Sequence, residues 1–162
     1  MKEKTACFTG HRNLPGDSLQ AIEACVKDRI VALIGCGVIY YGCGGARGFD
    51  LLAANCVIEL KKQYPQIRLI MVLPCKDQAN GWNDADCSNY QFVLRHADKI
   101  VYIAQEYTRR CMLDRNDHLI DHSGYCIAYL TQARGGTAYT VRRARAKGLA
   151  VDNIAADLSK QG

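Results

Sequence analysis

The stretch YYGCGGARGFD at residues 40–50 places four glycines within seven positions, directly after a short apolar run. Glycine adopts positive φ angles at no steric cost and lets another backbone or a ligand approach closely. The stretch therefore predicts a strand that ends in a sharp turn before a helix. Either the glycines only turn the chain, or they surround an anionic ligand. Asp50 falls in the first turn of that helix, where it would cap the helix or hold a ribose hydroxyl.

Strand and helix patterns alternate on both sides of this stretch. We expect helices over residues 19–34, 49–64, 85–96 and 112–123, with another between residues 135 and 148. Strands are expected at 5–10, 38–42, 67–74, 99–104, 124–130 and, more briefly, 149–154. This alternation favours parallel strands joined by right-handed crossovers. The predicted fold class is α/β, a Rossmann-like three-layer sandwich with a mainly parallel central sheet and helices on both faces.

Composition fits one soluble domain covering residues 1–162. The chain is 49% apolar and 23% charged, as in ordinary globular proteins. Its net charge of +5 fits an anionic ligand such as a nucleotide, whereas the densest basic cluster, VRRARAK at 141–147, is typical of a solvated helix face. No segment approaches the roughly 20 apolar residues of a membrane span, and the N-terminal residues do not resemble a signal peptide. We therefore expect a cytoplasmic protein.

The cysteines and histidines give no prediction of a metal site or cofactor. None of the nine cysteines forms a close-spaced pair, so they are interpreted as reduced, small hydrophobic residues. His118 and His122 lie four residues apart and should share a helical face, but HLIDH lacks the glutamate of a zinc-protease motif and has no evident third ligand. Neither a metal site nor a cysteine–histidine nucleophile is predicted.

In an open parallel sheet, ligands bind outside the carboxyl ends of the strands. This rule selects the loops at residues 10–16, 43–48, 74–83, 104–112 and 131–137. Two of these loops carry glycines and lead directly into helices, whose first N–H groups receive phosphate well. The glycine motif differs from a dinucleotide fingerprint, because it follows the second strand and Asp50 comes at once. A hydride-transfer dehydrogenase is therefore a poor fit.

Five motifs in this order resemble the YpsA-like branch of the SLOG superfamily: CFTGHR (7–12), GGARGFD (44–50), LPCKDQANGW (73–82), RNDHLIDHS (115–123) and GGTAYTV (135–141). The resemblance covers residues 5 to 150. SLOG is a Rossmann-like group that also includes the Lonely Guy phosphoribohydrolases and the DNA-processing protein A family. The resemblance implies a Rossmann-like fold that binds a nucleotide or a nucleotide derivative, and self-association as a homodimer. It implies more about the fold than about any chemistry.

Carried onto this sequence, the resemblance gives a set of candidate ligand-binding residues at the strand ends. Arg12 can donate two hydrogen bonds to one phosphate, and Trp82, the only tryptophan, offers a stacking face for a base. Gln78 could bind the edge of that base. Gly44 and Gly45 are expected to place N–H groups around a phosphate. The full set is Thr9, Gly10, His11, Arg12, Gly44, Gly45, Gly48, Asp50, Pro74, Gln78, Trp82, Arg115, Asn116, Gly136 and Thr137.

Three functions remain open. Lonely Guy enzymes carry a Gly-Gly-x-Gly-Thr loop followed by a glutamate three residues after its threonine, but here RGGTAYT is shorter and Thr140 occupies that position. A hydroxyl cannot replace a general acid–base carboxylate, and only Glu106 or Asp121 could substitute. We therefore favour a nucleotide sensor or binding module over an enzyme that cleaves a nucleotide N-glycosidic bond. Single-stranded nucleic-acid binding is the weakest alternative.

Overall fold

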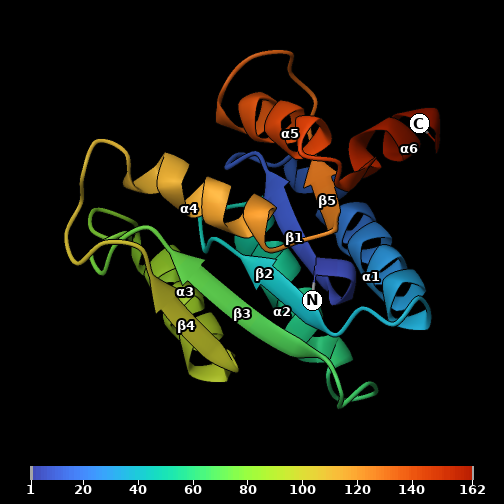
Figure 1. Ribbon diagram of the computed structural model, residues 1–162, viewed down its shortest axis with the longest axis horizontal. Coiled ribbons are helices and arrows are strands. Elements are labelled where there is room, and N and C mark those ends of the chain that lie inside the picture. Colours follow the sequence, from blue (N-terminus) through green and yellow to red (C-terminus); the bar gives the residue numbers. More distant parts are fainter. Residues whose placement is uncertain (1, 162) are drawn as a thin grey trace.

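The computed structural model describes residues 2–161, and its centre is a six-stranded sheet in which every pairing is parallel (Figure 1). The strand order is β4-β3-β2-β1-β5-β6. The strands are β1 (Thr5–Gly10), β2 (Tyr40–Cys43), β3 (Arg68–Leu73), β4 (Lys99–Tyr102), β5 (Tyr125–Tyr129) and β6 (Ala150–Asn153). The predicted α/β, Rossmann-like fold class is confirmed.

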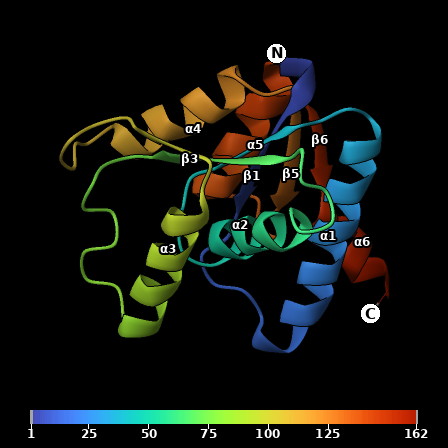
Figure 2. The ribbon, with the colours of Figure 1, turned by 90° about the horizontal axis from the view of Figure 1, so that it is seen from below.

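Helices cover both faces of the sheet (Figure 2). They are α1 (Leu19–Gly35), α2 (Phe49–Leu60), α3 (Asp84–His96), α4 (Cys111–Asp121), α5 (Gly136–Ala146) and α6 (Ile154–Gln161). Helices α4 and α5 pack together on one face, while α1, α2 and α3 pack in a row on the other, with α6 against α1. The three predicted layers are therefore present. Among residues 2–161, no helix is long and apolar enough to cross a bilayer.

The expected elements are found close to their predicted positions, and the differences lie at their ends. Helix α2 ends at Leu60 rather than near Tyr64, and α1 continues to Gly35, one residue beyond its predicted end. Helix α6 and the short 3-10 helices η1 (Lys2–Lys4) and η2 (Gly16–Ser18) were not expected. Leu158 of α6 packs on the main core cluster, so tertiary contact supports a helix that is too short to be stable alone.

The strand order reverses direction at β1, which pairs with β2 on one side and with β5 on the other. Cys7 of β1 is in register with Gly42 of β2 and with Cys126 of β5. A crevice opens at the carboxyl ends of strands where the order reverses, because the connecting helices leave toward opposite faces. The end of β1 is therefore the candidate position for a binding site.

Candidate functional site

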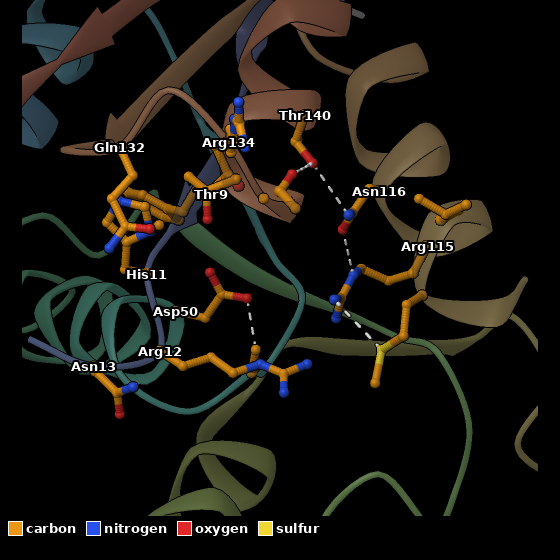
Figure 3. Close-up of a pocket in the computed structure, with 18 residues that line it drawn as sticks. Thr9, His11, Arg12, Asn13, Asp50, Arg115, Asn116, Gln132, Arg134 and Thr140 are labelled. Carbon is orange, nitrogen blue, oxygen red and sulfur yellow. Dashed lines mark hydrogen bonds between the residues drawn. The ribbon is translucent and has the colours of Figure 1, made fainter.

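A cavity of about 430 Å³ lies at the carboxyl ends of β1 and β5 (Figure 3). Its walls come from the end of β1 and the loop after it, the start of α2, the first turns of α4, and the loop that leads into α5. Nine of the residues selected from the sequence line it: Thr9, Gly10, His11, Arg12, Asp50, Arg115, Asn116, Gly136 and Thr137.

Two glycines let the end of β1 and the loop after it lie against the start of α2 at this cavity. A Cβ at Gly10 would lie 2.4 Å from the Phe49 ring, and a Cβ at Gly48 would lie 2.1 Å from the Arg12 carbonyl oxygen. Gly48 also has a φ of 78°. The Phe49 amide donates to the His11 carbonyl at 3.1 Å, which joins the two loops. Gly10 and Gly48 therefore position the loop after β1 against the start of α2.

Asp50 places a buried carboxylate in the wall of the cavity. Its side chain accepts a hydrogen bond from the Ala46 amide at 3.2 Å, so it holds the preceding loop rather than capping its own helix. Burial raises the pKa of Asp50 to about 6, although the nearby guanidinium groups of Arg115 and Arg12 and the Ala46 amide favour the charged form. Asp50 is thus an ionisable acceptor in a desolvated position.

A chain of hydrogen bonds crosses the cavity from the β2–α2 loop to the start of α5. Arg115 is buried; it donates to the Gly44 carbonyl at 2.5 Å and to the Asn116 side-chain oxygen at 2.7 Å. Asn116 donates to the Thr140 hydroxyl at 3.2 Å, which donates to the Gly136 carbonyl at 2.9 Å. These bonds lock the side chains of α4 and fix the two loops relative to each other (Figure 3).

The start of α5 is the open side of the cavity. Gly135 precedes the helix with a φ of 102°, and no side chain caps the first turn. A Cβ at Gly135 or at Gly136 would meet nothing within 4 Å. The uncapped N–H groups of this turn and the helix dipole therefore face space that an anion can enter.

Arg12 and Arg134 are exposed cations at the rim of the same cavity. Among residues 2–161, neither guanidinium takes part in an ion pair or a side-chain hydrogen bond. His11 differs, because its Nε2 accepts from the Thr131 amide at 2.9 Å and burial lowers the pKa of its ring. His11 thus supports the loop after β5 as a neutral ring.

A second cavity of about 310 Å³ adjoins the first and shares Arg12, Ala46 and Met112 with it. Gln78 and Trp82 line this second cavity. The Gln78 amide donates to the Gly44 carbonyl and to the Tyr90 hydroxyl, both at 3.3 Å. Trp82 meets Tyr90 edge-on at 5.2 Å between ring centroids, and the Arg47 guanidinium lies 5.4 Å from its ring.

Four predicted residues line neither cavity. Gly44 and Gly45 are buried, and a Cβ on them would meet Arg115 and Leu73 respectively. Gly48 lines another cavity, of about 490 Å³, which shares Arg12 and Asn13 with the first. The buried Pro74 accepts from the Ala104 amide at 3.0 Å and so joins the ends of β3 and β4.

The structure also brings in residues that the sequence did not select. They are the polar residues Asn13, Gln132, Arg134 and Thr140, with Gly135 beside them. Arg134 directly precedes the Gly-Gly-Thr turn, and this position in the sequence could have identified it as a candidate ligand-binding residue. Glu106 and Asp121, the carboxylates considered as substitutes for the missing glutamate, line neither cavity; Asp121 is exposed near Lys147 on α5.

His118 and His122 do share a face of α4, with ring centroids 4.2 Å apart. The His122 ring pairs with the His118 carbonyl, and burial lowers the pKa of His118. Neither ring lines the two cavities. The pair is therefore separate from this site.

Comparison with solved structures confirms the fold. DNA processing protein A from Helicobacter pylori superposes with a TM-score of 0.65 at 18% identity, over 93% of this chain and 64% of that chain. The protein of the same name from Streptococcus pneumoniae gives a TM-score of 0.65 at 15% identity, over 91% of this chain and 48% of that chain. This chain thus spans just under two thirds of the first protein and about half of the second.

Curated relatives carry names without an assigned activity. An uncharacterised SPbeta prophage-derived protein, YoqJ, from Bacillus subtilis is 32% identical over 58% of this chain and 62% of its own length. A UPF0398 protein from Bacillus thuringiensis is 27% identical over 80% of this chain and 72% of its own length. A family model described as the YspA SLOG family matches residues 8–155. The chain therefore belongs to the YpsA family of SLOG proteins.

Proposed function

We propose that this protein binds a phosphorylated nucleotide or nucleotide derivative in the cavity at the ends of β1 and β5. The observation that carries the proposal is that nine residues selected from separate sequence motifs line one cavity. Its volume of about 430 Å³ lies within the range of small-molecule sites. The proposed role is that of a sensor or binding module.

The phosphate end of the ligand is proposed to lie at the start of α5. Gly136 and Thr137 open this helix, and Arg134 precedes it with an unpaired guanidinium. Arg12 enters the cavity from the loop after β1. N–H groups at a helix start and guanidinium groups are strong partners for phosphate oxygens.

The second cavity is the proposed place for the base. It adjoins the first cavity, with Arg12, Ala46 and Met112 lining both, and Trp82 gives it an aromatic wall. Trp82 is the only tryptophan of the chain, so its fluorescence should report ligand binding without interference. Unchanged fluorescence at saturating ligand would remove Trp82 from the proposed site.

Hydrolysis of an N-glycosidic bond is not part of the proposal. The Thr140 hydroxyl stands where the resembling hydrolases carry glutamate, and it is bonded to Asn116 and to the Gly136 carbonyl. Without a carboxylate there, the leaving base has no acid from that position. Incubation with nucleoside monophosphates should release no free base at enzymatic rates, measured by chromatography.

The test is a calorimetric titration with a panel of ribonucleoside mono- and diphosphates. Arg12→Gln and Arg134→Gln should each weaken binding about tenfold or more, because each removes charged hydrogen bonds to the ligand. The matched control is Arg95→Gln, which removes the same charge from an exposed site on α3 that lines neither cavity. Equal affinity of all three variants and the natural protein would refute the site.

Single-stranded DNA is a second candidate ligand. The Helicobacter pylori protein is described by its unique single-stranded DNA binding mode, and it shares this fold. Arg142 and Arg145 are exposed three residues apart on α5, and Arg142 donates to the carbonyl of Ala133, the residue before Arg134. In this case an oligonucleotide should bind with a steep salt dependence, about 0.7 decades in affinity per decade of salt for each phosphate contacted. A mononucleotide should then compete only weakly.

A further inference from the structure

We infer that the cavity selects a phosphorylated ribose over its 2-deoxy form, because the Asp50 carboxylate accepts a hydrogen bond from the sugar hydroxyl. The inference rests on the proposed function and names the ligand class of that site. A carboxylate is an acceptor with room for several hydrogen bonds. A deoxy sugar would leave the carboxylate oxygen buried without a hydrogen-bond donor. The free-energy cost of that unpaired oxygen lowers the affinity for the deoxy sugar relative to ribose.

The geometry leaves one carboxylate oxygen free for a ligand. Asp50 is 7% exposed, and within residues 2–161 its side chain has one hydrogen bond, from the Ala46 amide to Oδ2. Figure 3 shows the other oxygen pointing away from Ala46, toward the part of the cavity where Thr9 lies. The site therefore contains an almost completely buried acceptor that a bound molecule can complete.

The charges of the cavity orient such a ligand. Asp50 supplies the only carboxylate among the residues lining the cavity, whereas the start of α5 and Arg134 present donors and positive charge. A phosphate is repelled by Asp50 and attracted by the helix start. A sugar phosphate satisfies both ends, with its anion at α5 and a hydroxyl at Asp50.

The hydrogen bond from the Ala46 amide does not by itself require the charge of Asp50. The bond from the Ala46 amide needs one acceptor oxygen, which asparagine also has. Burial raises the pKa of Asp50 to about 6, so the ionised form is kept at neutral pH at the expense of stability. The guanidinium groups of Arg115 and Arg12 offset part of this cost, and a hydroxyl that donates to the free oxygen would offset more of it.

The experiment measures the affinities of ribose 5-phosphate, 2-deoxyribose 5-phosphate and inorganic phosphate by NMR titration. The natural protein should prefer ribose 5-phosphate over the deoxy compound by about tenfold or more. Asp50→Asn should reduce that preference to about twofold, while its affinity for inorganic phosphate stays equal or rises. Asp114→Asn, an exposed carboxylate on α4 that lines neither cavity, is the matched control and should keep the full preference.

The outcomes separate this inference from the proposed function. Binding of phosphate with no preference for ribose, or an unchanged preference in Asp50→Asn, overturns the role of Asp50 and leaves the anion site standing. Absence of binding for all three compounds overturns the anion site, and with it the inference. A ribose preference would also count against single-stranded DNA as the ligand, because DNA lacks the 2′-hydroxyl.

Discussion

The two glycine-bearing helix starts of this protein look alike in sequence and differ in structure. Gly48 precedes α2 with a φ of 78°, and Gly135 precedes α5 with a φ of 102°; no side chain caps either helix. At Gly48 an added Cβ would collide with backbone, whereas at Gly135 and Gly136 it would meet open space. An atom added at Gly48 would meet protein, whereas an atom added at Gly135 or Gly136 would enter open space.

This difference shows that glycine serves two purposes at the same sheet edge. In the β2–α2 loop, the glycines make room for protein: Gly44 faces the Arg115 guanidinium, and Gly48 faces the loop after β1. In the β5–α5 loop, Gly135 and Gly136 border space that no protein atom fills. The hydrogen bonds from Gly44 through Arg115, Asn116 and Thr140 to Gly136 tie the packed start to the open one.

The largest expected effect comes from adding one methyl group at each start. Gly48→Ala should destabilise the fold by more than about 5 kcal/mol, because the new Cβ collides with the Arg12 carbonyl and the residue keeps a positive φ. Gly136→Ala should change the free energy of unfolding by less than about 1 kcal/mol, since it adds a methyl to an open helix start. Urea unfolding of both variants measures this.

Equal stability of the two variants would contradict the comparison. It would mean that the loop after β1 moves away from Gly48 at little cost. Binding of phosphate to Gly136→Ala, measured separately, tests whether the open start is used by a ligand.

A second prediction tests the link between the two starts. Arg115→Met should cost about 3–5 kcal/mol, because it removes buried, charged hydrogen bonds to Gly44 and Asn116. Arg110 precedes the same helix, and its side chain is 71% exposed. Arg110→Met should therefore lower the free energy of unfolding by less than about 0.5 kcal/mol. A cost for Arg115→Met as small as that of the control would show that the two starts are held independently.

The smallest expected effect has the opposite sign and concerns Asp50, the acid beside the packed start. Its pKa is raised to about 6 in the folded protein, chiefly by burial, so the folded state binds a proton more tightly than the unfolded state does. Stability should therefore fall as the pH rises from about 4 to 6 and stay lowered above that range. Asp50→Asn should then stabilise the protein at pH 7 by roughly 2–3 kcal/mol, at 1.36 kcal/mol per pKa unit.

This gain should shrink between pH 6 and pH 4, where the natural carboxyl becomes neutral. Thermal unfolding of both proteins across this range measures the difference, and Asp114→Asn provides the exposed control. A gain that is constant with pH would mean that the charge of Asp50 has no part in it.

Much of the fold followed from local patterns. Apolar spacing predicted α1, and the apolar run at residues 67–74 predicted β3, because these elements place their own apolar residues against the sheet core. The exact helix ends and α6 were beyond such reasoning, since they depend on contacts with distant residues.

By itself the sequence determined the α/β alternation and nine of the residues that line the cavity at the ends of β1 and β5. Only the tertiary structure decided what each does there. It buried Gly44 and Gly45 against Arg115 and Leu73, and left Gly136 open. The physical reason is that a glycine in the sequence indicates only that space is needed at its position. Whether protein or ligand fills that space depends on residues far away in the chain.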